Sequence, residues 1–263
     1  MKSRFVVIAA LLFCACSPVR NDLDRYALNC KVKELSMHSE SMELPYTARF
    51  NSLGQLTTLT TYDFDGEERF VQTYSYDSHN KLYEVSGVDA EGITEERIEY
   101  EIEGLFIREC RIYGMNNQEV HRWVHENDGK HIVRTEYYSE GELDYIATKD
   151  FKGNSYVEES RKPEGELMGR AEVDFFNDEN KPTRIVSDDL DVEISYNEKG
   201  LPVMSRGAVL NSLGELQWAS SLDEYPCRYY SYEYDNRGNW ITRYERKSPD
   251  SPDYIVIKRE IVY

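Results

Sequence analysis

A glycine or asparagine closes a short polar turn about every twelve residues along most of this chain. The first such positions are Gly54, Gly66, Asn80, Gly92, Gly104, Asn117, Gly129, Gly141, Gly153 and Gly165. A period this short leaves room for one strand and one turn, so it predicts consecutive β-hairpins. Glycine and asparagine suit these positions because they tolerate a left-handed backbone.

The turns share one plan, seen in Tyr76-Asp77-Ser78-His79-Asn80 and in Tyr234-Asp235-Asn236-Arg237-Gly238. An Asp or Asn side chain at the first turn position bonds the backbone two residues on and so reverses the chain. Successive turns of a meander lie on opposite edges of the sheet, so we expect alternate turns to line each edge. Between turns the residues alternate with the period of a strand, for example in Phe70, Gln72, Tyr74 and Tyr76 and in His121, Trp123 and His125.

The sequence therefore predicts an all-β fold, a single long antiparallel β-meander of roughly 14 to 16 hairpin-connected strands. We expect an open, curled single-layer sheet or a half-barrel, although turn spacing sets strand length and not curvature. Residues 30–37 alternate well enough for a first strand, and residues 23–28 suit a turn of helix. The rhythm loosens after Gly165, with an extra turn expected at 187–190 and a longer loop at 222–226.

The segment Tyr232-Glu233-Tyr234-Asp235-Asn236-Arg237-Gly238-Asn239-Trp240, with Tyr76-Asp77 and Tyr196-Asn197, resembles the YD-repeat (Rhs-type) family. The resemblance is closer to the small YD-repeat lipoproteins of Bacteroidetes, and it covers about residues 46–263. Large members of the family wrap a long β-sheet around a toxin domain. This chain has no room for such cargo, so the resemblance implies a β-sheet fold without an encapsulating role.

The first sixteen residues read as a signal peptide with a lipoprotein cleavage site. Lys2 and Arg4 precede the apolar stretch 5–13, which is too short to span a membrane. Ala15 then precedes Cys16, which we expect to be lipidated and to anchor the chain to the outer membrane, on its periplasmic or cell-surface face. The alternative is an ordinary secreted protein cleaved near Ala15. The expected organisation is a signal peptide (1–15), a lipidated tether with the first strand (16–45) and the meander (46–263).

The mature chain is strongly acidic. Removing residues 1–15 takes Lys2 and Arg4 from the 31 basic residues, against 49 acidic ones, which leaves a net charge of −20. Such a surface repels nucleic acid, so we exclude it as a partner.

Motifs for catalysis or cofactor binding are missing from the sequence. It has no Gly-x-Ser-x-Gly elbow, no phosphate-binding glycine loop and no His-Glu-x-x-His. His125 and His131 flank the Gly129 turn, either as a metal site or as solvated turn residues. Asp63, Asp65 and the acidic run 188–191 could bind Ca²⁺, but turn chemistry explains them as well. Cys30, Cys110 and Cys227 form no disulfide framework. We expect no cofactor and no enzyme.

Aromatic residues are the best binding candidates. An exposed platform for stacking on sugars or docking a protein would use Trp123, Trp218, Trp240, Tyr230 and Tyr232. The alternative is that these rings cover a sheet face in place of a second layer. The sequence thus favours a non-catalytic envelope protein that presents a sheet face to a protein or glycan. The alternatives are a half-barrel that shelters an apolar ligand or lipid, and a hydrolase acting on envelope glycans.

Overall fold

The computed structural model describes residues 22–39, 45–176, 181–187, 190–211, 216–218 and 227–263. Within them lies one short helix, α2 (Asp22–Arg25), in the segment where a helical turn was expected. All other elements are strands. Their bounds are β1 (Glu34–Ser39), β2 (Tyr46–Phe50), β3 (Leu56–Tyr62), β4 (Glu68–Tyr76), β5 (Leu82–Asp89), β6 (Thr94–Glu103), β7 (Phe106–Tyr113), β8 (Glu119–Asn127), β9 (Ile132–Ser139), β10 (Glu142–Lys152), β11 (Ser155–Arg161), β12 (Leu167–Phe176), β13 (Lys181–Ser187), β14 (Leu190–Tyr196), β15 (Pro202–Arg206), β16 (Ala208–Leu210), β17 (Leu216–Trp218), β18 (Arg228–Tyr234), β19 (Trp240–Arg246) and β20 (Tyr254–Val262).

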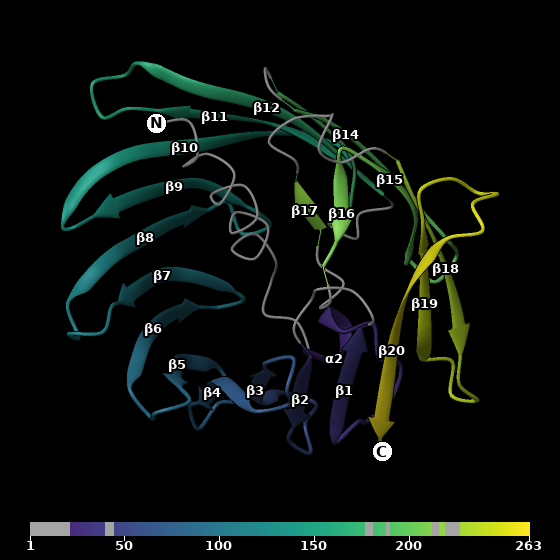
Figure 1. Cartoon of the computed structure of the whole chain (residues 1–263). Coiled ribbons are helices and arrows are strands. Elements are labelled where there is room, and N and C mark those ends of the chain that lie inside the picture. Colours follow the sequence, from purple (N-terminus) through teal and green to yellow (C-terminus); the bar gives the residue numbers. More distant parts are fainter. Residues whose placement is uncertain (1–21, 40–44, 177–180, 188–189, 212–215, 219–226) are drawn as a thin grey trace.

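The strands close into an 18-stranded antiparallel barrel. Strands β1 to β15 pair in chain order, β15 pairs with β18, and β18 to β20 continue the meander (Figure 1). Closure comes from β20, which pairs with β1 from Glu34↔Val262 to Ser39↔Ile257. The prediction of an all-β antiparallel meander is confirmed, but the prediction of an open curled sheet or half-barrel is wrong.

The turns explain why the sheet curls far enough to close. In the turn after β4, the Asp77 carboxylate accepts hydrogen bonds from the backbone N–H groups of His79 and Lys81, both at 2.8 Å, and Asn80 has a φ of 61°. The register between β4 and β5 shifts by one residue beside this turn. Similar shifts recur beside most hairpins, and a β-bulge bends its strand and increases its twist. Repeated bulges therefore supply the curvature that turn spacing alone does not reveal.

Alternate turns lie at opposite ends of the barrel, as expected from the meander. We call the end at which β1 begins the near rim and the opposite end the far rim. The near rim carries the turns at 51–54, 77–80, 128–130, 197–200 and 235–238, together with the segment that leads into β1. The far rim carries the turns at 63–66, 90–92, 114–117, 140–141, 162–165 and the loop at 247–253. The ten glycine or asparagine positions named first in the sequence analysis all have positive φ, which confirms their role in the turns.

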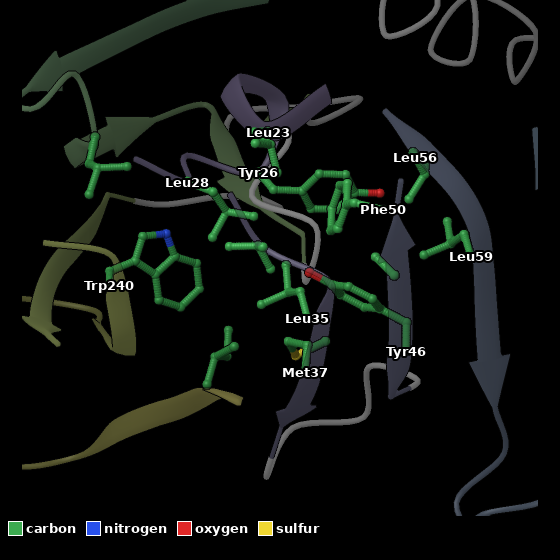
Figure 2. Packing of buried hydrophobic residues seen from close by; sticks show 14 residues of the cluster. Leu23, Tyr26, Leu28, Leu35, Met37, Tyr46, Phe50, Leu56, Leu59 and Trp240 are labelled. Carbon is green, nitrogen blue, oxygen red and sulfur yellow. The ribbon is translucent and has the colours of Figure 1, made fainter. Parts of the chain in front are cut away.

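The segment from α2 to β1 lies inside the barrel and builds the main apolar core (Figure 2). Leu23, Tyr26 and Leu28 pack against inward side chains of β1 to β3, including Leu35 and Tyr46. Tyr26 also meets Phe50 edge-on, with ring centroids 5.5 Å apart. The buried Arg259 of β20 donates to the carbonyl of Tyr26 at 2.8 Å and lies 3.4 Å from the ring centroid of Trp240. One cation thus ties the inner segment to the seam that closes the barrel.

A second inner element is the hairpin β16–β17, which projects into the ring in Figure 1. The hydroxyl of Ser205 donates to the carbonyl of Ala208 at 2.7 Å, and the backbone N–H of Leu210 donates to the Tyr230 hydroxyl at 3.2 Å. The buried Arg243 of β19 donates to the carbonyl of Asn211 at 3.0 Å. Side chains of the wall therefore hold this hairpin by its backbone.

The two inner elements matter because a barrel of eighteen strands is too wide for its side chains alone to fill. Eighteen strands at about 4.8 Å spacing, tilted by about 40° as in other barrels, make a wall roughly 113 Å around, or about 36 Å across between backbones if circular. Side chains alone fill barrels of about eight strands, whereas larger barrels need other material inside them. The α2 segment and the β16–β17 hairpin provide it here.

Substitutions at Gly87 and Gly169, two glycines at inward-facing positions, test how tightly the wall is packed. A Cβ added at Gly87 of β5 would lie 2.2 Å from Cζ of Phe70, whereas one at Gly169 of β12 would meet nothing within 4 Å. We expect Gly87→Ala to lower the free energy of unfolding by about 1–3 kcal/mol, because Phe70 must move. Gly169→Ala should leave it unchanged or raise it by up to about 1 kcal/mol. Urea unfolding measures both, and an equal effect of the two variants would contradict this packing.

Candidate functional site: the inner wall of the barrel

The strand register decides which side chains face into the barrel. Leu35, Met37, Tyr46 and Ala48 pack around the inner α2 segment, so these positions face inward. Cross-strand partners point to the same face of a sheet, and alternate residues of a strand point to opposite faces. Following the partners around the ring from β2 to β8 places Trp123 on the inner face.

Three aromatic rings line the inner wall side by side, one from each of β8, β9 and β10. The rings of Trp123 and Tyr137 lie 5.9 Å apart between centroids, and those of Tyr137 and Tyr145 stack at 4.2 Å with 15° between their planes. Trp123 pairs with Tyr137, and Tyr137 with Tyr145, in the strand register. We call Trp123, Tyr137 and Tyr145 the aromatic row.

Polar side chains continue the inner wall toward the near rim. His125 of β8 shares a hydrogen bond of 2.9 Å between its Nδ1 and the hydroxyl of Thr135. Its Nε2 is buried without a hydrogen-bond partner. On the next strands, Nζ of Lys149 lies 3.4 Å from the Glu158 carboxylate and 4.9 Å from the ring centroid of Tyr156. Buried charges are normally paired, as here.

Burial sets the protonation of His125. The imidazole is only 5% exposed, and loss of solvent, followed by the charge of nearby Lys149, lowers its pKa to about 4. The ring is therefore neutral at pH 7, so its two nitrogens comprise one donor and one acceptor. Nε2 therefore keeps one hydrogen-bonding position that no described group of the protein uses.

The other predicted aromatic residues serve the packing of the inner face on β18 and β19. The Tyr230 hydroxyl lies 3.1 Å from the hydroxyl of Ser205, and the Tyr232 hydroxyl donates to the carbonyl of Pro202 at 2.8 Å. Trp240 is 3% exposed and belongs to the apolar core. The four candidates whose side chains are described, Trp123, Tyr230, Tyr232 and Trp240, do not form one exposed platform. Ligand binding by Trp123, Tyr230, Tyr232 and Trp240 stays a prediction.

Two predicted residues fall outside what the structure describes. Cys16 lies outside the described residues, so its lipidation stays a prediction. Trp218 ends β17, and its side chain is not among those described. The turn expected at 187–190 and the loop at 222–226 likewise include residues beyond the described ranges, although β13 and β14 pair on either side of the former.

His125 and His131 contact different side chains, and the Asp63 carboxylate bonds to its own turn. His131 stacks on Phe151 at 4.0 Å between centroids, whereas His125 faces Thr135. The Asp63 carboxylate accepts from the backbone N–H groups of Asp65 and Glu67, each at 2.9 Å, as turn chemistry requires. No group of three side chains suited to hold a metal ion occurs among the described residues. The cysteines at 30, 110 and 227 are free thiols.

A hollow of about 540 Å³ opens at the far rim, lined by Phe70, Asp89, Glu91 and Glu95 among others. Its carboxylates could suggest a hydrolytic pair. However, the Asp89 carboxylate already accepts from the backbone N–H groups of Glu91 and Ile93, at 2.9 and 2.8 Å. This carboxylate serves its own turn, so the hollow does not rank with the inner wall as a candidate site.

The outer wall carries ion pairs, some between neighbouring strands and some between residues two apart on one strand. Arg97 of β6 contacts Glu84 and Glu99, and Arg134 of β9 contacts Glu126 at 2.6 Å and Glu136 at 2.7 Å. Similar outward pairs are Arg49–Glu34, Arg111–Glu109, Arg170–Glu172 and Arg206–Glu193. Exposed pairs add only about 0–1 kcal/mol each, so their main effect is to cover the outer wall with charge.

Sequence reasoning placed His121, Trp123 and His125 on one strand face, and the register confirms it. It did not single out Thr135, Lys149 or Glu158. The sequence did contain a signal for Lys149 and Glu158, because each is a charged residue among the otherwise mostly uncharged inward positions of its strand. Reading that signal required knowing which face points inward.

No protein-family model and no curated protein matches the chain. Among solved structures, a porin-like protein from Bacteroides uniformis matches with 12% identity and a TM-score of 0.44, over 88% of this chain and 96% of that one. A chain of the TcdB2–TccC3–Cdc42 complex matches with 10% identity and a TM-score of 0.30, over 84% of this chain and 13% of that one. Neither likeness assigns a family or a function. No described helix is long and apolar enough to cross a membrane.

The depressed pKa of His125 predicts a pH dependence of stability. Because the unfolded state binds the proton more tightly, the stabilisation is complete above about pH 6.5 and is lost as the pH falls toward 4. Between these limits we expect a loss of about 3 kcal/mol in the free energy of unfolding. His125→Gln should remove this part of the slope, whereas His79→Gln in an exposed turn should retain it. Urea midpoints at several pH values measure the slope; a wild-type slope in His125→Gln would contradict the assignment.

Proposed function

We propose that this protein is a lipid-anchored, non-catalytic binding protein of the bacterial cell envelope, whose barrel stands in water and binds a glycan at its inner wall. The observation that carries the proposal is the contrast between the two walls. The outer charges pair with one another, whereas the inner wall combines the aromatic row with a buried, unpartnered Nε2 on His125.

The outer wall supports an aqueous barrel. A barrel that crosses a bilayer turns an apolar band toward the lipid, and an Arg or Lys at the midplane costs about 2–4 kcal/mol. Here Arg97 and Arg134 lie within outward strand positions, each among carboxylates. A bilayer would have to solvate these side chains or expel them. Water solvates them at no such cost, so a barrel beside the membrane is favoured over one that spans it.

The amino-terminal sequence supports the anchor. A cysteine that carries more than one acyl chain is held stably at a bilayer surface. Cys16 follows a basic start, an apolar stretch and the small residue Ala15, as a lipoprotein cleavage site requires. An anchored barrel with a strongly acidic surface also stays soluble at the membrane without associating through its outer face.

The chemistry of the inner wall favours a glycan over the other ligands considered. Sugar rings stack on flat aromatic side chains, and their hydroxyls suit the neutral His125 and the Lys149–Glu158 pair. A folded protein domain is too large for a ring about 36 Å across between backbones that already holds chain segments. An apolar ligand or lipid is disfavoured because the chain's own Leu23, Tyr26 and Leu28 already pack against the apolar inner face of β1 to β3.

A glycan array tests this function. The chain from Ser17 onward, made without a signal and without detergent, is applied to bacterial envelope oligosaccharides. We expect binding of at least one glycan by the wild type, and a loss of about two- to tenfold in affinity for Trp123→Ala, since a lost aromatic contact costs about 0.5–1.5 kcal/mol. The outer-wall variant Arg170→Gln serves as the control and should bind as the wild type does.

The outcomes separate the parts of the proposal. No binding above background would contradict the glycan function. Binding that is lost in Arg170→Gln but kept in Trp123→Ala would move the recognition surface to the outer wall. A circular dichroism spectrum and a urea midpoint for each variant show that it is folded, and the milder Tyr137→Leu replaces Trp123→Ala if the latter unfolds.

A further inference from the structure

The two rims of the barrel differ in charge. Most near-rim turns place a base beside an acid, as in Glu198-Lys199, Asp128-Gly129-Lys130 and Asp235-Asn236-Arg237, whereas Glu103 beside Gly104 has no base in its turn. Lys31 and Lys33, both exposed, lead into β1 at the same rim. The near rim is therefore close to electrically neutral, although the chain as a whole carries a large negative charge.

The far rim holds more acids than bases, although Arg69 lies beside its hollow and Lys162 pairs with Glu166 at 2.6 Å. The first two far-rim turns read Asp63-Phe64-Asp65-Gly66 and Asp89-Ala90-Glu91-Gly92, and the fourth reads Glu140-Gly141-Glu142. The lining of the hollow at this rim adds Glu95. Much of the excess negative charge of the protein is thus concentrated at one end of the barrel.

The chain enters the barrel at the near rim. Asp22, the first described residue, accepts hydrogen bonds from the backbone N–H of Leu56 at 2.8 Å and from the Tyr76 hydroxyl at 3.0 Å. Leu56 begins β3 and Tyr76 ends β4, and both of these strand ends lie at the near rim. The entry point is therefore fixed by two hydrogen bonds to the wall.

The tether from this entry point is short. Cys16 precedes Asp22 by six residues, which reach at most about 21 Å when fully extended. The seven residues of β3 alone rise about 20 Å along the strand before the far-rim turn begins. To bring Cys16 to the far rim, the tether would have to run almost straight along the full height of the wall. At the near rim it needs no such extension.

We propose that the near rim faces the lipid surface that holds the anchor, and that the far rim points away from it. The proposal rests on the anchor of the proposed function and adds an orientation that the lipid alone does not impose. Bilayers with anionic headgroups repel acidic protein surfaces within a Debye length of about 8–10 Å. The tether and the charge difference therefore select the same end of the barrel.

A pair of matched labels tests the orientation. Ser78 and Ala90 occupy the same position in successive Asp-x-x-Asn/Gly turns, Ser78 at the near rim and Ala90 at the far rim, and both are exposed. Ser78→Cys and Ala90→Cys are made separately in full-length protein in which Cys30 and Cys227 are replaced by Ser. Cys110 is retained, because it is buried and burial, with Glu96 and Glu109 nearby, raises its pKa to about 12.

Each lipidated variant is labelled with a fluorophore and bound to vesicles of phosphatidylethanolamine and phosphatidylglycerol that carry a nitroxide on the headgroup. Contact quenching acts over short distances, so we expect several-fold stronger quenching at Ser78→Cys than at Ala90→Cys. In Lys31→Glu/Lys33→Glu the difference between the two sites should shrink as the phosphatidylglycerol content rises, since the near rim then also becomes acidic.

The results separate orientation from anchoring. Equal quenching at both sites, or stronger quenching at Ala90→Cys, in protein that floats with the vesicles would overturn the orientation and leave the anchor intact. Protein that does not float with the vesicles would overturn the anchor and the orientation with it. The Cys16→Ser variant, which should not float, is the control for non-specific adsorption.

Discussion

The whole barrel depends on one local interaction, the bond from an Asp or Asn side chain to the backbone of its own turn. The Asp77 carboxylate accepts two backbone N–H groups, which lowers its pKa, and the same arrangement recurs at Asn51, Asp63, Asp89, Asn197 and Asp235. Each turn ends in a left-handed Gly or Asn and lies beside a one-residue register shift. Because the shift bends its strand, regular repetition accumulates curvature until β20 meets β1.

Closure at eighteen strands imposes a second requirement, since inward side chains cannot fill so wide a ring. Two segments of the chain enter the barrel, and each is tied to the wall by a buried arginine. Arg259 bonds the carbonyl of Tyr26, and Arg243 bonds that of Asn211. Burial lowers the pKa of Arg259 to about 10, and its position 3.4 Å from the Trp240 ring centroid offsets part of the cost of burying the charge. The side of the wall away from these segments carries the aromatic row and His125.

The rhythm of the turns was enough to predict antiparallel strands, the left-handed positions and the two rims, because each depends on residues within one hairpin. The number of strands was underestimated, since roughly 14 to 16 were expected and the barrel has 18. Closure was not predictable in this way. It depends on pairing between residues 34–39 and 254–262, which lie at opposite ends of the chain, and on small bends that sum over many hairpins. The inner hairpin was not predicted, because its place inside the barrel depends on contacts with distant residues such as Tyr230 and Arg243. For the site, the alternation of residues was enough to put Trp123 and His125 on one face of a strand. Lys149 and Glu158 could be recognised as a buried ion pair only once the structure showed which face points inward.

The most direct test of this account is a disulfide across the closing seam. Ser36 and Glu260 are outward cross-strand partners of β1 and β20, at a separation that suits a disulfide. In protein with Cys30 and Cys227 replaced by Ser, peptide mapping after mild oxidation should find the bond in Ser36→Cys/Glu260→Cys. Peptide mapping should also find a disulfide in Thr242→Cys/Lys258→Cys, a positive control that joins β19 and β20. It should find none in the negative control Ser36→Cys/Ser86→Cys, whose strands are not paired. A bond between positions 242 and 258 without one between 36 and 260 would mean that the sheet is open, and would contradict the closed barrel.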